Sequence, residues 1–152
     1  MKILVCTDGS QHSKKALEKA AILAEGCNVD EVGIIHVYDE SVNLSALPRG
    51  EAYAPTEEDM KNFKTILEEN KKEANKILED AQDYLERKNI KARTILKEGR
   101  PADTIVKTAS EDGFDTIVIG SRGRSGLQKI FLGSVSSAVV QESKNCSVLT
   151  VK

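Results

Sequence analysis

The sequence has no long hydrophobic segment. No apolar run approaches the roughly 20 residues that span a bilayer, and Met1 and Lys2 lead directly into a strand-like segment. A secretory signal would place a longer apolar run at this point. We therefore expect a cytoplasmic protein with no membrane partner.

An excess of charge of either sign is also missing. Lys and Arg together number 22 and Asp and Glu number 24, which gives a formal net charge of -2. A surface that coats nucleic acid, or a polybasic membrane patch, would add positive charge. We expect no nucleic-acid partner, and any anion-binding site must be confined to a small part of the surface.

Cysteine is scarce and is not arranged for metal binding. The three cysteines, Cys6, Cys27 and Cys146, have neither CxxC nor zinc spacing. Cys6 and Cys146 lie in or beside strand-like segments and are predicted to be small core residues. Such usage suits a reducing cytoplasm.

Known catalytic and nucleotide fingerprints are absent as well. The sequence has no Ser-His-Asp order, no paired-carboxylate cluster and no HExxH pattern. It lacks the GxxxxGK[ST] loop, and no GxGxxG follows its first strand-like segment. No catalytic residue is predicted from these patterns.

What the chain does contain is a regular alternation of short apolar segments and stretches with helical periodicity. This alternation predicts an α/β fold with a single open parallel sheet, right-handed crossovers and helices on both faces. At 152 residues we expect one domain, residues 1–152. Residues 39–55 fit neither pattern and are predicted to form a long loop. Strands are predicted at 2–7, 32–38, 92–97, 114–120 and 147–151, and helices after Ser10, over 56–89, from Pro101 and from Gly133 to about Gln141.

The longest periodic element carries an apolar row with a seven-residue spacing. Met60, Leu67, Ala74 and Ala81 form this row, and a capping-type start is predicted at Thr56. A helix face that lies on the sheet and a free coiled coil both fit the spacing. The packed face is favoured because few of the repeats are strongly apolar at both core positions.

A glycine-rich segment, residues 120–136, follows the fourth strand-like segment. Gly120 and Gly123 lack side chains, which allows unusual dihedral angles and close approach by a ligand. Gly133 and Ser134 begin a helix, where unpaired N–H groups and the helix dipole favour phosphate.

Positive charge and a facing loop complete this pattern. Arg122, Arg124 and Lys129 supply charge beside the glycines, and the Thr7–Ser10 turn follows the first strand. Ligands of open parallel sheets bind beyond the carboxyl ends of the strands, so both segments are predicted to line a phosphate site. The alternative is a flexible crossover, with Asp8 as a helix-capping residue and the arginines as solvated loop charges.

The spacing Gly120-x-x-Gly123, nine residues, then Gly133-Ser134 resembles the G-2x-G-9x-G-[S/T] motif of ATP-binding universal stress proteins. The opening ILVCTDGSQHSKKAL, the IIHVYD segment and the closing SVLTVK resemble the same family, in the same order. The resemblance covers essentially the whole chain.

The resemblance implies a five-stranded parallel sheet of order 3-2-1-4-5, similar to the adenine nucleotide α-hydrolase group. It implies an ATP-binding regulatory or stress-response protein, with AMP and cyclic AMP as other candidate ligands and at most slow ATP hydrolysis. A magnesium or manganese ion would be bound by the triphosphate, beside Asp8. An adenylyl- or phosphoryl-transferring enzyme and a nucleotide-free dimeric interaction protein are the alternatives, and the intact motif argues against the latter.

Residue by residue, the resemblance implies an adenine edge at Cys6 and Thr7 and a backbone contact from Val37. It also implies a homodimer formed through the final strand, Val148 to Val151. The complete predicted site comprises Cys6, Thr7, Asp8, Val37, Ile119, Gly120, Ser121, Arg122, Gly123, Arg124, Gly133, Ser134, Val135 and Ser136.

Overall fold

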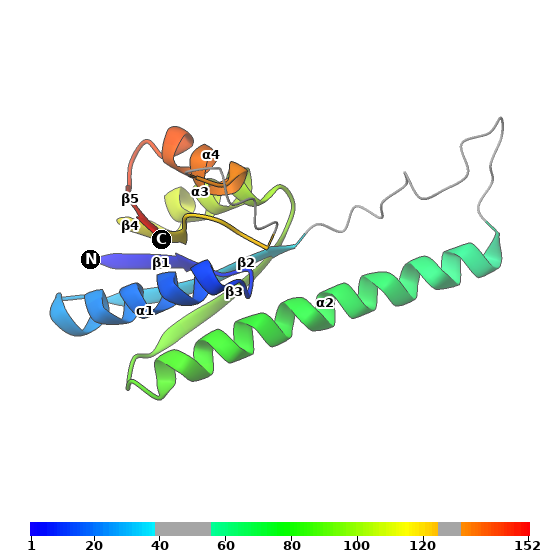
Figure 1. The fold of residues 1–152 in the computed structure, drawn as a ribbon, viewed down its shortest axis with the longest axis horizontal. Coiled ribbons are helices and arrows are strands. Elements are labelled where there is room, and N and C mark those ends of the chain that lie inside the picture. The colour runs from blue at the N-terminus through cyan, green and yellow to red at the C-terminus, as the bar shows by residue number, and fades with distance from the viewer. Residues whose placement is uncertain (39–55, 125–131) are drawn as a thin grey trace.

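The computed structural model describes residues 1–38, 56–124 and 132–152. Strands and helices alternate along the chain, as the sequence predicts (Figure 1). The strands are β1 (Lys2–Cys6), β2 (Glu31–Tyr38), β3 (Ala92–Glu98), β4 (Thr116–Gly120) and β5 (Ser147–Val151), and the helices are α1 (Gln11–Gly26), α2 (Glu57–Glu86), α3 (Pro101–Glu111) and α4 (Ser134–Glu142).

The five strands form one parallel sheet in the order β3-β2-β1-β4-β5, which confirms the predicted fold class and strand order. β1 is central and pairs with β2 on one side and β4 on the other. The chain passes from β1 outward to β2 and β3, and then returns to the other side of β1 at β4. The strand order therefore reverses beside β1, where open α/β sheets bind their ligands.

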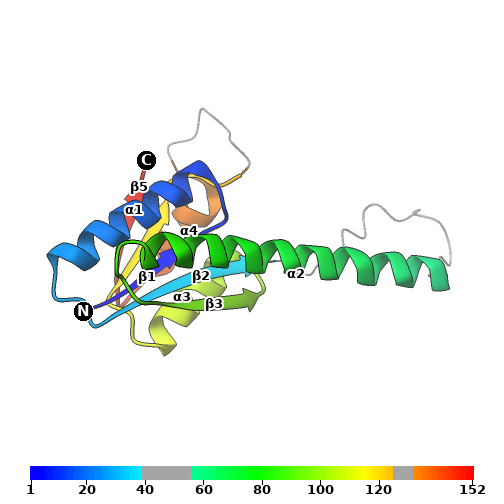
Figure 2. The same cartoon turned by 90° about the horizontal axis from the view of Figure 1, so that it is seen from below.

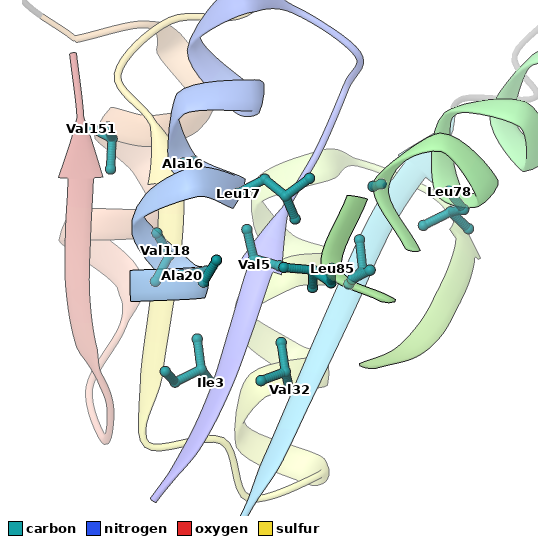
Figure 3. Close-up of a cluster of buried hydrophobic side chains, with 13 residues drawn as sticks. Ile3, Val5, Ala16, Leu17, Ala20, Val32, Leu78, Leu85, Val118 and Val151 are labelled. Carbon is teal, nitrogen blue, oxygen red and sulfur yellow. The ribbon is translucent and has the colours of Figure 1, made fainter. Parts of the chain in front are cut away.

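Helices cover both faces of the sheet (Figures 1 and 2). Alternate residues of a strand face opposite sides, so Ile3 and Val5 pack with α1 and α2 while Leu4 and Cys6 pack with α3 and α4. Figure 3 shows the first of these two cores, which joins Leu17 of α1 to side chains from α2 and four strands. The two apolar layers fix the orientation of each strand, and with it the positions of the loops at the strand ends.

Three helix starts follow the predicted local chemistry. The Ser10 hydroxyl accepts a hydrogen bond from Ser13 N–H at 3.2 Å, which caps α1. Thr56 and Asp59 form a reciprocal capping box at the start of α2. Pro101 occupies the first turn of α3, where its missing N–H has no cost to the helix.

The prediction that the whole apolar face of α2 lies on the sheet is wrong for its N-terminal half. Ala74, Leu78 and Leu85 are buried, but Met60 remains 49% exposed, and α2 extends past the sheet in Figures 1 and 2. At 1.5 Å per residue a 30-residue helix is about 45 Å long. β2, the longest neighbouring strand with eight residues, spans only about 26 Å.

The structure also gives the environment of the three cysteines and the character of the helices. Cys6 is buried, Cys146 packs partly against the core and Cys27 is exposed, and all three are free thiols. None of the helices that the structure describes is both long and apolar enough to cross a bilayer.

Candidate functional site

A cavity of about 250 Å³ lies at the carboxyl ends of β1, β2 and β4, beside the first turns of α3 and α4. Thr7 and Asp8 of the turn after β1 and the described part of the glycine-rich segment both contribute to its lining. Every predicted site residue except Ser121 lines the cavity. The predicted residues that do so are Cys6, Thr7, Asp8, Val37, Ile119, Gly120, Arg122, Gly123, Arg124, Gly133, Ser134, Val135 and Ser136.

The loop after β1 is held in place by its neighbours. Thr7 N–H donates to the Ile35 carbonyl at 2.9 Å, and the ring of His36 contacts the Thr7 carbonyl at 2.7 Å through Nδ1. A carbonyl oxygen only accepts, so Nδ1 carries the proton. His36 is thus a buried histidine with a structural partner. Gly9 adopts a φ of +77°, which turns the chain into α1.

Asp8 presents a carboxylate at the cavity. Burial alone would raise the pKa of Asp8, but hydrogen bonds from Ser10 and Ser13 and the nearby charge of Arg124 together lower it. One of these bonds joins Ser10 N–H to Asp8 Oδ1 at 3.0 Å. Asp8 therefore both supports the turn before α1 and holds a negative charge at neutral pH.

The glycines of the motif allow close approach and not unusual dihedral angles. Positive φ values among the described glycines occur only at Gly9, Gly99 and Gly113. A β-carbon on Gly123 would stand 2.7 Å from Asp8 Oδ2. The bare backbone of Gly123 therefore lets the two loops meet across the cavity.

Gly120 serves a different close approach. A β-carbon there would lie 2.7 Å from the carbonyl carbon of His12 and 2.9 Å from the Ser13 nitrogen. These are backbone atoms in the first turn of α1, which cannot move aside without displacing the helix. Gly120 is thus required for α1 to pack across the end of β4, whatever binds in the cavity.

The first turn of α4 supplies backbone donors. Gly133 is its N-cap, and no side chain in the described ranges caps the helix. The first N–H groups have no intrahelical partner. The Ser136 hydroxyl is 3.0 Å from both the Ser121 and Gly133 carbonyls and is therefore engaged with the backbone. Ser134 is exposed and is one of the residues that line the cavity.

Ser121 has a structural place behind the cavity. Its N–H donates to the Val151 carbonyl and its carbonyl accepts from Gly133 N–H, both at 2.7 Å. These bonds join the end of β4 to the end of β5 and to the start of α4. The Ser121 side chain is 1% exposed, and its hydroxyl has no hydrogen-bond partner among the described residues.

Two arginines bring positive charge to the cavity. Arg122 Nε is buried and unpaired within the described part of the chain. Arg124 is exposed and donates from Nη1 to Glu73 Oε1 of α2 at 2.7 Å. An unpaired buried guanidinium N–H costs free energy unless an acceptor reaches it, and Arg122 is also one of the residues that line the cavity. Lys129 lies outside the described residues.

Part of the cavity lining is apolar. Ile35, Val37 and Ile105 belong to the core between the sheet and α3 and α4, and Pro101 lies one turn before Ile105. Burial raises the pKa of the Cys6 thiol, so Cys6 is neutral and adds to this part of the lining. The cavity thus joins an apolar slot to a rim of backbone donors and charges.

The described residues show no metal cage. No three His, Cys, Asp or Glu side chains in these ranges gather closely enough to hold an ion. Asp8 is the single carboxylate among the described lining residues.

Comparison with known proteins identifies the family of this chain. The model of the universal stress protein family matches residues 1–152. The chain belongs to this family. Universal stress protein YxiE of Bacillus subtilis is 42% identical over 151 residues, which cover 99% of this chain and 98% of that protein.

Solved structures show the same fold. The structure of MJ0577 of Methanocaldococcus jannaschii has 32% identity and a TM-score of 0.74, with 99% of this chain and 94% of that chain covered. A universal stress protein in complex with cAMP has 28% identity and a TM-score of 0.67, covering 100% and 97%. The universal stress protein of Archaeoglobus fulgidus in complex with dAMP has 26% identity and a TM-score of 0.64, covering 100% and 98%.

Sequence reasoning missed four residues of this universal stress protein's cavity: Ser13, Ile35, Pro101 and Ile105. The parity of β2 could have found Ile35, since it shares a strand face with Val37. Pro101 and Ile105 are four residues apart and so share a helix face. Their place beside the cavity depends on how α3 packs, which no local pattern reports.

Proposed function

We propose that residues 1–152 act as a single universal stress protein domain that binds an adenine nucleotide, ATP in particular, in this cavity. In this proposal the protein is a nucleotide-dependent regulatory or stress-response protein of the cytoplasm. The observation that carries it is that one cavity is lined by apolar side chains, by the start of α4 and by Arg122. Among the described residues, no side chain caps α4 and Arg122 Nε has no hydrogen-bond partner. The cAMP and dAMP bound by two related proteins support the choice of an adenine nucleotide.

The base would enter the apolar slot and meet the backbone of Val37. β1 ends at Cys6, whereas β2 continues to Tyr38. The Ile35 carbonyl accepts a hydrogen bond from Thr7 N–H. In a parallel sheet, the backbone N–H and C=O groups of every second residue point toward the same neighbouring strand. Val37 therefore directs its N–H and C=O past the end of β1. Adenine offers an amino donor beside a ring-nitrogen acceptor, which suits that pair.

The phosphate groups would lie at the rim of the cavity. The first N–H groups of α4 favour an anion through their unpaired donors and the helix dipole. Arg122 Nε would gain the acceptor that it lacks. A cavity of about 250 Å³ is slightly smaller than the roughly 300–1,000 Å³ of typical ligand sites. It suits the base and ribose, with the phosphates at the mouth.

A divalent cation would be held through the nucleotide. Asp8 offers one carboxylate with a lowered pKa at the rim, and one carboxylate plus phosphate oxygens is a usual magnesium environment. The cation would supply charge neutralisation to the phosphates. Asp8 fits this indirect role because a protein cage needs several ligands.

Nucleotide occupancy is proposed to act as a state of the protein. Among the described lining residues there is no histidine, and Asp8 is the one carboxylate, so we assign no catalytic residue and expect at most slow ATP hydrolysis. A ligand that binds one conformation better shifts the population by its differential affinity. Occupancy would in this way change the surface that a partner meets.

We further propose a homodimer through β5. Among the described strands, β5 lies at the edge of the sheet and pairs only with β4, and such an edge can pair with another chain. Leu149 is 38% exposed on it, whereas Val151 is buried in the core. The exposed residues of Val148 to Val151 would form the contact.

Calorimetric titration tests the proposal. ATP, AMP, cAMP and GTP are titrated separately into the purified protein in the presence of magnesium. We expect ATP to bind with a dissociation constant near 1 μM, about -8 kcal/mol, and GTP to bind at least ten times more weakly. Equal affinity for ATP and GTP, or no binding of any adenine nucleotide, would contradict the proposal.

A further inference from the structure

Arg124 connects the cavity to α2 through an ion pair. Arg124 is one of the residues that line the cavity, and its Nη1 lies 2.7 Å from Glu73 Oε1. Glu73 stands where the buried part of α2 begins, one residue before Ala74. A negative side chain from a distant part of the sequence is thus paired with a cation at the rim of the proposed phosphate site.

Arg124 can exchange Glu73 for another anionic partner at little cost in free energy. The two side chains are 57% and 58% exposed, and exposed ion pairs contribute little free energy because water screens them. A guanidinium forms stronger, bidentate contacts with phosphate than with one carboxylate oxygen. A phosphate group at the rim would therefore compete successfully for Arg124.

We propose that Glu73 competes with the phosphate groups of the bound nucleotide for Arg124 and so sets how strongly the site prefers ligands with more phosphates. This inference rests on the proposed nucleotide-binding function. Glu73 acts through Arg124 and is a positioning residue. Each additional phosphate adds negative charge near Arg124. The affinity of a ligand with more phosphates therefore increases more when the charge of Glu73 is removed.

The test compares three ligands that share a base. ATP, AMP and adenosine are titrated into the wild type and into Glu73→Gln. The variant is expected to bind ATP more tightly, by about 1.5- to fivefold, which is the range for losing one exposed ion pair. The change for AMP is expected to be smaller, and adenosine affinity is expected to stay the same. A purely structural role of Glu73 would change all three affinities together.

Two further variants isolate the contact. In an Arg124→Gln background, Glu73→Gln is expected to have little effect on ATP affinity, because the guanidinium for which Glu73 and phosphate compete is absent. Asp80→Asn is the matched control, because Asp80 pairs with Lys76 on the same helix at 3.1 Å and is 64% exposed. It is expected to leave all three affinities unchanged.

The outcomes separate this inference from the proposed function. A wild type that binds neither adenosine nor ATP overturns both. A wild type that binds ATP, with a Glu73→Gln variant that binds it equally well or more weakly, overturns the competition alone. Equal tightening for ATP and adenosine also overturns it.

Discussion

Gly123 and Asp8 meet so closely that a β-carbon on Gly123 would stand 2.7 Å from Asp8 Oδ2. The two residues come from loops 115 positions apart in the sequence. Each loop follows a central strand, β4 and β1, and these strands are paired neighbours. The contact therefore closes one side of the cavity, and it exists only because residue 123 has no side chain.

Gly123→Ala is expected to weaken nucleotide binding while the fold stays intact. The new methyl group would push the Asp8 carboxylate aside and narrow the rim, and a carboxylate at the end of a short side chain can turn away. We expect at least a tenfold loss of ATP affinity, about 1.4 kcal/mol. Calorimetry measures the affinity, and circular dichroism checks the fold. Unchanged ATP affinity would show that this contact is not part of the binding site.

Gly120→Ala is expected to destabilise the fold itself. Its β-carbon would lie 2.7 Å from a backbone atom of His12, and overpacking of this kind costs roughly 1–3 kcal/mol. Urea unfolding measures the change. Gly26→Ala is the control, because a β-carbon there meets nothing within 4 Å. Equal unfolding midpoints for the two variants would contradict this account of Gly120.

The stability that Asp8 contributes is expected to disappear in acid. The pKa of Asp8 is lowered in the folded protein, whereas an unfolded aspartate has a pKa of about 3.9. A lowered folded pKa means that the ionised group stabilises the fold above the unfolded value, and that this stability is lost as the pH falls through the folded pKa.

Urea unfolding of the wild type and of Asp8→Asn measures this effect. The difference between their free energies of unfolding is expected to be constant from about pH 5 to 7 and to shrink below about pH 4. A difference that grows on acidification would mean that the fold raises the pKa of Asp8.

Leu149→Lys is expected to convert the proposed dimer into a monomer. Leu149 is exposed on the unpaired edge of β5, and charged residues on edge strands block pairing between chains. Analytical ultracentrifugation of the wild type and the variant at equal concentration measures the mass. A monomeric wild type, or a variant that stays dimeric, would rule out this interface.

Local patterns predicted much of this molecule. The helices and strands and their order along the chain were predictable because they depend on local sequence. The signals are the apolar segments, the caps at Ser10 and Thr56, and Pro101. The G-2x-G-9x-G-S spacing located the cavity, because parallel strands end at one edge of the sheet.

Long-range packing was not predictable in the same way. The seven-residue row beginning at Met60 does not reveal where the sheet ends, so the N-terminal half of α2 was placed on it wrongly. The spacing also does not show that Gly120 faces the backbone of α1. The Arg124–Glu73 pair joins residues 51 apart, and it depends on how α2 crosses the sheet.

The most direct test of the account is to find which amides respond to ATP. ATP is titrated into uniformly ¹⁵N-labelled protein, and backbone amide shifts are followed by NMR. We expect the largest shifts at Val37, Gly123 and the first turn of α4. Shifts confined to the opposite end of the sheet, or none at millimolar ATP, would contradict it.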